Sequence, residues 1–161
     1  ATANNINYGA RYTASTVDLS QAVAVSDGTS GGAKAEKKVF VRGDGTVLGY
    51  QVAINTTSCF IYKNGTWLAT LSTGQSWPDT ANHTLKITAS GTVTVTIEGF
   101  VDGISQGTTT DSTSPYTSGN PGIQLEGLAN AAQSAFDDWT DGAAVGGGPP
   151  PGSWMMMGLG V

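Results

Sequence analysis

Paired carboxylates would be the most informative chemistry in this sequence. Glycoside hydrolysis needs an acid and a second carboxylate on opposite sides of the bond, and alternate residues of a strand share one face. No Glu-x-Asp-x-Glu pattern is present, and Glu36, Glu98 and Glu126 lie far apart in the sequence. Asp137 and Asp138 are adjacent, so they point to opposite faces of a strand and are interpreted as a strand end that bonds loop amides. The sequence therefore predicts no catalytic residues and no enzyme.

The single histidine and the single cysteine provide no nucleophilic site either. His83 begins a predicted strand beside a turn, and no Gly-x-Ser-x-Gly elbow accompanies it, so a surface histidine is the expectation. Cys59 falls in an apolar run, which predicts a small buried hydrophobe. A lone cysteine also excludes an internal disulfide.

Sugar binding needs aromatic platforms with a few polar partners, and two loop aromatics are the candidates. Trp77 and Tyr116 lie in long polar loops, where a core role is less automatic than in a strand. For Trp77 we favour a structural role over sugar binding: the side chain is expected to cover the open end of the fold as a plug. Trp67 and Tyr50 lie in predicted strands and are expected in the core.

Length and composition favour one all-β domain. The chain has 161 residues, 39% hydrophobic and 12% charged, with 23 glycines, which suits short strands and tight turns. A net charge of −5 gives no reason to expect nucleic acid, and no stretch is apolar enough to span a membrane. The basic residues Lys34, Lys37, Lys38 and Arg42 are interpreted as guarding a solvated strand edge.

A hairpin within residues 39–71 organises the predicted sheet. Asn64-Gly65 separates two apolar runs, and a type I′ turn needs positive φ at both central residues. Cys59–Lys63 and Thr66–Leu71 are therefore predicted to pair antiparallel. The predicted register sets Tyr62 opposite Trp67 and Ile61 opposite Leu68. Both faces then carry apolar groups, so we expect the hairpin inside a layered structure, with little of it on an open edge.

Alternation and turn residues predict the remaining elements. One face of residues 84–89 carries Leu85, Ile87 and Ala89, and one face of residues 92–97 carries Val93, Val95 and Ile97. Asp102-Gly103 predicts a second hairpin, from Phe100-Val101 to Ile104-Ser105. Further strands are expected at Ala10–Ala14, Ala22–Val25, Gly122–Leu128 (Ile123 and Leu125 inward) and Ala135–Thr140 (Phe136 as core anchor), with a loop at Thr108–Pro121. No segment has a convincing helical period.

Three regions follow from these elements. Residues 1–9 are expected to form an arm, residues 10–142 a β-sandwich, and residues 143–161 a Gly/Pro linker with an apolar tail. The tail offers five side chains that should not remain in water: Trp154, Met155, Met156, Met157 and Leu159. They either fold back on their own sandwich or dock on a neighbouring subunit.

Several segments, taken together, resemble the concanavalin A-like lectin/glucanase superfamily in its laminin-G-like branch. They occur in the family's order and are Val41–Val52, Ile61–Leu71, His83–Gly103, Thr110–Ile123 and Ser134–Gly142, the last containing Phe-Asp-Asp-Trp. The resemblance implies a jelly-roll sandwich of two antiparallel sheets, one of them concave. The arm and tail resemble, in composition, those of viral structural proteins, including capsid decoration proteins.

The resemblance also raises calcium as a cofactor. Members of the superfamily often hold calcium with loop carboxylates and carbonyls, and Asp102, Asp111 and Asp137 are the candidates here. No EF-hand-like spacing is visible, and Asp102 has an alternative role as the first residue of a hairpin turn. We therefore predict no metal site and no cofactor, with calcium left open.

Two functions are compatible with these expectations. The leading one is a non-enzymatic structural module of a virion or other surface assembly, attached to a protein partner or neighbouring subunits through its termini. The alternative is a lectin-like domain that binds glycans through Trp77 and Tyr116, and a degenerate glycosidase comes third. A virion or an extracellular surface is the expected location.

The tail generates the first prediction. Deleting residues 149–161 should abolish oligomerisation or particle attachment and leave the thermal midpoint of the isolated domain unchanged, because an extended Pro segment carries the apolar residues past their own sandwich. Analytical ultracentrifugation and thermal unfolding measure the two effects. A lower midpoint with association untouched would instead mean that the tail packs on its own domain.

Overall fold

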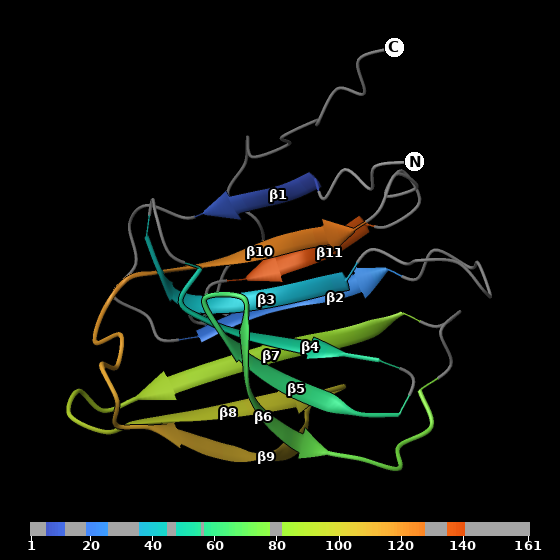
Figure 1. Ribbon diagram of the computed structural model, residues 1–161. Helices are drawn as coiled ribbons and strands as arrows, with labels where there is room; N and C mark the ends of the chain where they lie inside the picture. The colour runs from blue at the N-terminus through green and yellow to red at the C-terminus, as the bar shows by residue number, and fades with distance from the viewer. Residues whose placement is uncertain are drawn as a thin grey trace, which may run out of the picture.

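The computed structural model describes residues 6–11, 19–25, 36–44, 48–55, 57–77, 82–127 and 135–140, and this part of the chain is all β. Eleven strands form two antiparallel sheets that lie face to face (Figure 1). Among these residues no helix is long and apolar enough to cross a membrane. The strands are β1 (Ile6–Arg11), β2 (Leu19–Val25), β3 (Glu36–Gly43), β4 (Tyr50–Ile54), β5 (Cys59–Lys63), β6 (Thr66–Ser72), β7 (His83–Ser90), β8 (Val95–Val101), β9 (Ile104–Asp111), β10 (Asn120–Gly127) and β11 (Ala135–Thr140).

The six-stranded sheet has the order β1-β10-β3-β4-β5-β6, and the five-stranded sheet has the order β11-β2-β7-β8-β9. Strands β3 to β6 form a meander, and so do β7 to β9, because each of their connections is short. Long connections carry the chain between sheets, from β6 to β7 and from β9 to β10. The predicted all-β sandwich of two antiparallel sheets is confirmed.

Both predicted hairpin turns have the expected backbone. Asn64 and Gly65 have φ values of 49° and 79°, and Asp102 and Gly103 have 53° and 78°, as a type I′ turn requires. Tyr62 pairs with Trp67 as predicted. Ile61 pairs with Ala69 and not with Leu68, because the register shifts between Ile61 and Tyr62 and leaves an extra residue in β6.

The expected interior place of this hairpin is wrong. Strand β6 is the edge of the six-stranded sheet, and the side chain of Trp67 is 59% exposed. Two of the basic residues that were predicted to be exposed at a strand edge are instead buried inside the sheet. Lys38 and Arg42 lie on β3, between β10 and β4, and are each only 2% exposed. They do not guard a solvated edge.

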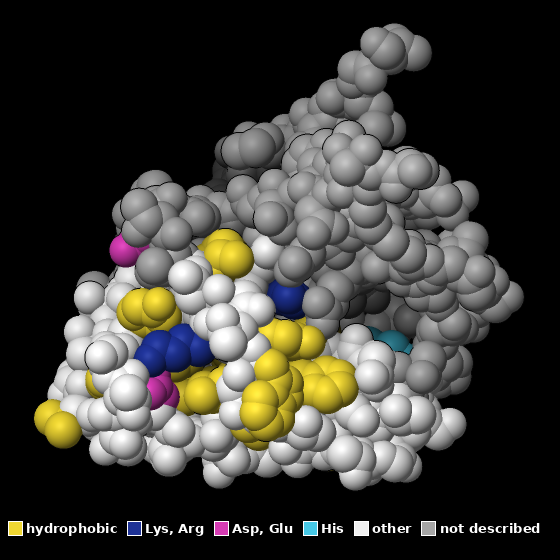
Figure 2. Space-filling model, in the orientation of Figure 1, with side chains coloured by type: hydrophobic (Ala, Val, Ile, Leu, Met, Phe, Trp, Pro, Cys, Tyr) yellow, Lys and Arg dark blue, Asp and Glu magenta, His cyan; other side chains and the backbone are white. Residues whose placement is uncertain are grey.

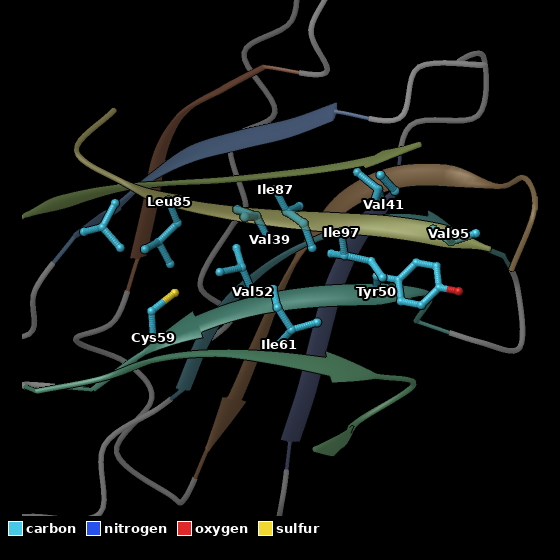
Figure 3. Close-up of a cluster of buried hydrophobic side chains, with 12 residues drawn as sticks. Val39, Val41, Tyr50, Val52, Cys59, Ile61, Leu85, Ile87, Val95 and Ile97 are labelled. Atoms are coloured by element: carbon cyan, nitrogen blue, oxygen red, sulfur yellow. The ribbon is translucent and has the colours of Figure 1, made fainter. Parts of the chain in front are cut away.

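The core lies between the sheets and is built from alternate residues of the strands (Figure 3). Leu85, Ile87 and Ala89 of β7 are buried as predicted, as are Val95 and Ile97 of β8. From the other sheet they meet buried residues of β3, β4 and β5, which are Val39, Val41, Tyr50, Val52, Cys59 and Ile61. Val93 was expected on the buried face but is 83% exposed, because residues 92–94 still belong to the turn that precedes β8.

Other boundaries move by several residues. Strand β1 begins at Ile6 and pairs with β10, so residues 6–9 of the expected arm belong to the sheet. Strand β9 runs to Asp111 and β10 starts at Asn120, which shortens the loop expected at Thr108–Pro121. Strand β11 has the predicted bounds, and Ile123 packs against the core. The side chains of Leu125 and Phe136 and all of residues 143–161 lie outside the described part.

Close approach of the two sheets at Gly99 generates the second prediction. A Cβ at this position of β8 would lie 2.8 Å from Leu71 Cδ1 and 3.1 Å from Val52 Cγ2. Gly99→Val should therefore lower the free energy of unfolding by about 1–3 kcal/mol through overpacking. Thr96→Val, on the exposed face of the same strand, is the control. Equal unfolding free energies for the two variants in denaturant would show that the core accommodates the larger side chain.

Candidate functional site

The outer face of the six-stranded sheet carries Trp67, the most exposed aromatic side chain among those that the structure describes. Cross-strand pairing sets its side chains in two rows that run from β10 to β6. The first row is Gly122, Phe40, Gln51, Tyr62 and Trp67. The second row is Gln124, Lys38, Ala53, Phe60 and Thr70. We call these two rows the aromatic face.

The half of the aromatic face that lies on β10, β3 and β4 is closed to solvent. Phe40, Gln51 and Ala53 are 0% exposed, although they point away from the second sheet. Gln51 Nε2 donates a hydrogen bond to Gln124 Oε1, and the Gly65 amide donates to Gln51 Oε1 at 2.7 Å. These buried amides are thus partnered, as buried polar groups must be, and they anchor the β5–β6 turn to the sheet.

The β5–β6 half is open and aromatic. Figure 2 shows a patch of hydrophobic side chains over β5 and β6, surrounded mainly by white atoms, with a dark blue and a magenta side chain at its left margin. The Phe60 and Tyr62 rings lie 6.4 Å apart, and the Lys38 ammonium lies 4.3 Å from the centre of the Tyr62 ring. Beyond them Trp67 is exposed, with its indole N–H 3.4 Å from Thr70 Oγ1. An exposed indole beside hydroxyl groups can stack on the apolar side of a sugar ring.

Sequence analysis missed Trp67 because it assumed regular alternation. Leu71 packs against the core, and in a regular strand Trp67, four residues earlier, would share its face. The extra residue in β6 reverses the alternation, so Leu68 and Leu71 both pack inward and Trp67 points outward. Nothing in the local sequence marks this bulge.

Strand pairing also changes the argument about carboxylates. Glu36 of β3 pairs directly with Glu126 of β10, although the two are remote in sequence. Their side chains lie outside the described part, so only their register position is known. Glu98, the third glutamate, accepts a hydrogen bond from Ser105 Oγ at 2.6 Å.

A polar cluster around Asp111 lies at the Lys63 end of β5. The Lys63 ammonium lies 2.6 Å from Asp111 Oδ2 and donates to the Thr113 and Ser114 carbonyl oxygens at 2.7 and 3.1 Å. The Tyr50 hydroxyl donates to Asp111 Oδ2 at 2.8 Å and accepts from the Tyr116 amide at 3.0 Å. These bonds join the two sheets to the β9–β10 loop.

The pKa values follow from this arrangement. Burial and the hydrogen bond to Asp111 raise the pKa of the Tyr50 hydroxyl, so it stays protonated and donates. Burial alone would raise the pKa of the Asp111 carboxyl, but hydrogen bonds from Lys63, Tyr50 and the Thr113 amide, with the Lys63 charge, lower it overall. The cluster is thus a fixed ion pair and not a proton donor.

Arg42 fastens the same end of the sandwich. Its Nη1 donates to the carbonyl oxygens of Gly91 and Tyr116, at 2.8 and 2.9 Å. Its φ of 56° is unusual for a residue other than glycine. Gly119 allows the close approach, since a Cβ there would lie 2.4 Å from the Arg42 carbonyl carbon. The guanidinium therefore holds the β7–β8 turn and the β9–β10 loop against β3.

The two loop aromatics predicted to bind sugar do not form one site. Tyr116 lies at the Tyr50–Lys63 end, where its ring is 5.7 Å from that of Tyr50. Trp77 lies near the opposite end of β5, because the backbone amide of Gln75, two residues before it, donates to the Thr57 carbonyl oxygen just before β5. Both side chains are half-buried and pack against the core. For Trp77 this agrees with the interpretation as a plug.

The candidate calcium ligands are also separated. Asp102 lies in the β8–β9 turn, where its carboxylate accepts from the Thr84 amide at 2.9 Å and lies 2.8 Å from His83 Nδ1. Asp111 ends β9 and is paired with Lys63, and the Asp137 side chain is outside the described part. The described residues contain no group of three or more His, Cys, Asp or Glu side chains suited to a metal.

The two remaining candidates of the sequence are enclosed. The His83 side chain is only 12% exposed, so the expected surface histidine is wrong, and its buried Nε2 has no hydrogen-bond partner among the described residues. Cys59 is fully buried as predicted, and burial raises the pKa of its thiol to about 12. A thiol so fully protonated is not a nucleophile.

Comparisons with known proteins bear on the fold. No protein-family model and no curated protein matches the sequence. Among solved structures, the carbohydrate-binding module CBM66 from Bacillus subtilis is similar, with a TM-score of 0.57 and 17% identity over 83% of this chain and 80% of that one. Sheep galectin-11, in complex with glycerol, has a TM-score of 0.52 and 14% identity, over 83% and 95% of the two chains.

A third similar structure is the potassium-bound carbohydrate recognition domain of Emp46p, with a TM-score of 0.50 and 14% identity over 87% of this chain and 80% of that one. All three are jelly-roll sandwiches of the concanavalin A-like type. At such low identity the likeness establishes the fold alone. The fold implied by the sequence resemblance is therefore confirmed, and a viral origin is not.

The Asp111 cluster generates the third prediction. Lys63→Met leaves a buried carboxylate without its ammonium partner, which should lower the free energy of unfolding by about 1–3 kcal/mol at neutral pH. Lys86→Met is the matched control, because this lysine lies on a strand over the Phe100 ring, 3.8 Å from its centre. Denaturant unfolding that finds the two variants equally stable would contradict the assignment.

The same cluster predicts a pH dependence. The pKa of Asp111 is lowered in the fold, so the stability that this group contributes is present above the ordinary carboxyl pKa of about 4 and is lost as the pH falls through the folded value. The free energy of unfolding, measured from neutral to acidic pH, should fall less steeply below about pH 4 for Asp111→Asn than for the parent. Parallel curves would contradict the lowered pKa.

Proposed function

We propose that this chain is a non-enzymatic carbohydrate-binding module whose site is the open half of the aromatic face. The observation that carries the proposal is Trp67, an indole 59% exposed on the edge strand of the six-stranded sheet. Tyr62 and Phe60 continue the aromatic surface from Trp67 toward the sheet centre. Exposed apolar groups of this size often mark a binding site.

The chemistry around Trp67 suits a sugar. A sugar ring has one side of C–H groups, which can cover the indole, and a rim of hydroxyl groups that need polar partners. Thr70, which is exposed, lies beside Trp67 on this face, with its Oγ1 3.4 Å from the indole nitrogen. Because the sheet and not a loop carries these residues, the surface is already formed before a ligand arrives.

The structural neighbours support this choice over the one that the sequence favoured. CBM66 is described as a carbohydrate-binding module, and the Emp46p domain as a carbohydrate recognition domain. None of them supports a virion role. The assembly hypothesis rests on residues 154–159, which lie outside the described part. A glycan-binding module would work at an extracellular surface.

The absence of catalysis is part of the proposal. The described side chains include no carboxylate pair on the aromatic face, and Asp111 is held by Lys63. The register position of Glu36 and Glu126 makes these two residues the ones to test. Hydrolysis of a glycan by the parent protein, lost in Glu36→Gln or Glu126→Gln, would show that the domain is an enzyme.

A glycan-array screen followed by calorimetry tests the binding. The parent should bind at least one glycan, and Trp67→Ala should weaken that binding by roughly tenfold or more, as for truncation of a central aromatic contact. Ile104→Ala is the matched control, because it removes an apolar side chain that is 68% exposed but lies on the other sheet. Unchanged affinity in Trp67→Ala would move the site elsewhere, and Tyr116→Ala would then be tested.

A further inference from the structure

We infer that the aromatic face, if it binds carbohydrate as proposed above, binds one neutral sugar ring at the end of a glycan. It does not bind a polysaccharide along the length of its chain. This inference rests on the proposed function and concerns the class of ligand. Three properties of the face lead to it: the width of its open part, the number of free aromatic surfaces and the charge around them.

Exposure falls steeply from the sheet edge inward. Trp67 on β6 is 59% exposed, and Tyr62 and Phe60 on β5 are half-buried. One strand further, Gln51 and Ala53 of β4 are 0% exposed, and Lys38 of β3 is 2% exposed. The open part is therefore two strands wide, or roughly 5–10 Å at the usual strand spacing. Across the strands, that width suits one or two sugar rings.

One aromatic surface is free for stacking. The Lys38 ammonium lies 4.3 Å from the centre of the Tyr62 ring, so this ring already has a cation on one side. Phe60 lies against Tyr62 at an interplanar angle of 54°, and the two rings do not form a flat platform. In the described part of this face, the Trp67 indole is left as the stacking surface. A single stacking surface selects a single ring.

The surroundings of Trp67 carry no accessible charge among the described residues. Its exposed neighbour on the same face of β6, Thr70, is uncharged. Lys38 is 2% exposed, and Lys63, whose side chain is 22% exposed, lies on the opposite face of the hairpin, where it holds Asp111. An acidic sugar would find no exposed cation here, and a basic one no exposed carboxylate. The hydroxyl groups of a neutral sugar match the Thr70 hydroxyl.

The experiment measures how affinity depends on chain length and charge. Starting from the best ligand of the array, its mono-, di- and hexasaccharides and a uronic acid analogue are titrated by calorimetry, at about 50 and about 500 mM salt, a range over which exposed charge pairs become screened. We expect affinities of the three neutral ligands within about threefold of one another, a weaker uronic acid, and no effect of salt, because each contact is uncharged.

Variants connect the result to the residue. Trp67→Ala should lose the binding of all three neutral ligands equally, and Trp67→Phe should restore part of it, because an aromatic surface is again present. Trp139, Trp154 and Trp77 remain as fluorescence probes of folding in both variants. If Trp67→Ala unfolds, Trp67→Phe and the chain-length series in the parent still decide the question.

Three outcomes would overturn the inference. Affinity that rises more than about tenfold from the mono- to the hexasaccharide would mean that the chain is bound along the sheet. Tighter binding of the acidic sugar, weakened by salt, would mean that a cation takes part. Sedimentation showing a dimer that Trp67→Ala dissolves would mean that a second copy covers the indole. In the first two outcomes the proposed function survives, whereas no binding of any glycan would refute both.

Discussion

The burial of facing apolar side chains between the two sheets is the constraint on which the rest of the structure depends. The chain has one cysteine, so no internal disulfide can help, and the described residues hold no metal cluster. Alternate residues of β3, β4 and β5 must therefore meet those of β7 and β8 with little free space. At Gly99 the sheets approach so closely that a Cβ would touch Leu71. Strand register is fixed by this packing, since a slip of one residue would move every apolar side chain to the wrong face.

Polar ties at one end of the sandwich complement the core. Two cations of the six-stranded sheet, Arg42 and Lys63, reach carbonyl oxygens of the β7–β8 turn and the β9–β10 loop, and Lys63 also pairs with Asp111 of the other sheet. The ammonium of Lys63 thus has a carboxylate and two carbonyls around it, oxygen groups of the kind that a calcium ion prefers. The positive φ of Arg42 is a local strain that these hydrogen bonds offset.

The exposure of Trp67 on the aromatic face results from an irregularity in the pairing of β5 with β6. The bulge in β6 allows Leu68 and Leu71 to fill the core while Trp67 faces outward from the same strand. Buried amides of Gln51 and Gln124 hold the neighbouring turn in place, so the indole sits on a rigid support. The exposed aromatic group and the closed part of the sheet beside it together determine how large a ligand can be accommodated.

Sequence by itself determined the fold class, both type I′ turns, the bounds of β11 and the buried faces of β7 and β8. These features depend on residues close together in the chain, on turn chemistry and on alternation. Only the tertiary structure decided that β6 is an edge, that Lys38 and Arg42 are buried, that Glu36 pairs with Glu126 and that Lys63 meets Asp111. It likewise decided that Trp67 is exposed, whereas Trp77 and Tyr116 pack at opposite ends of the core. Strand order and bulges arise from contacts between segments far apart in sequence, and neighbouring residues carry no signal of them.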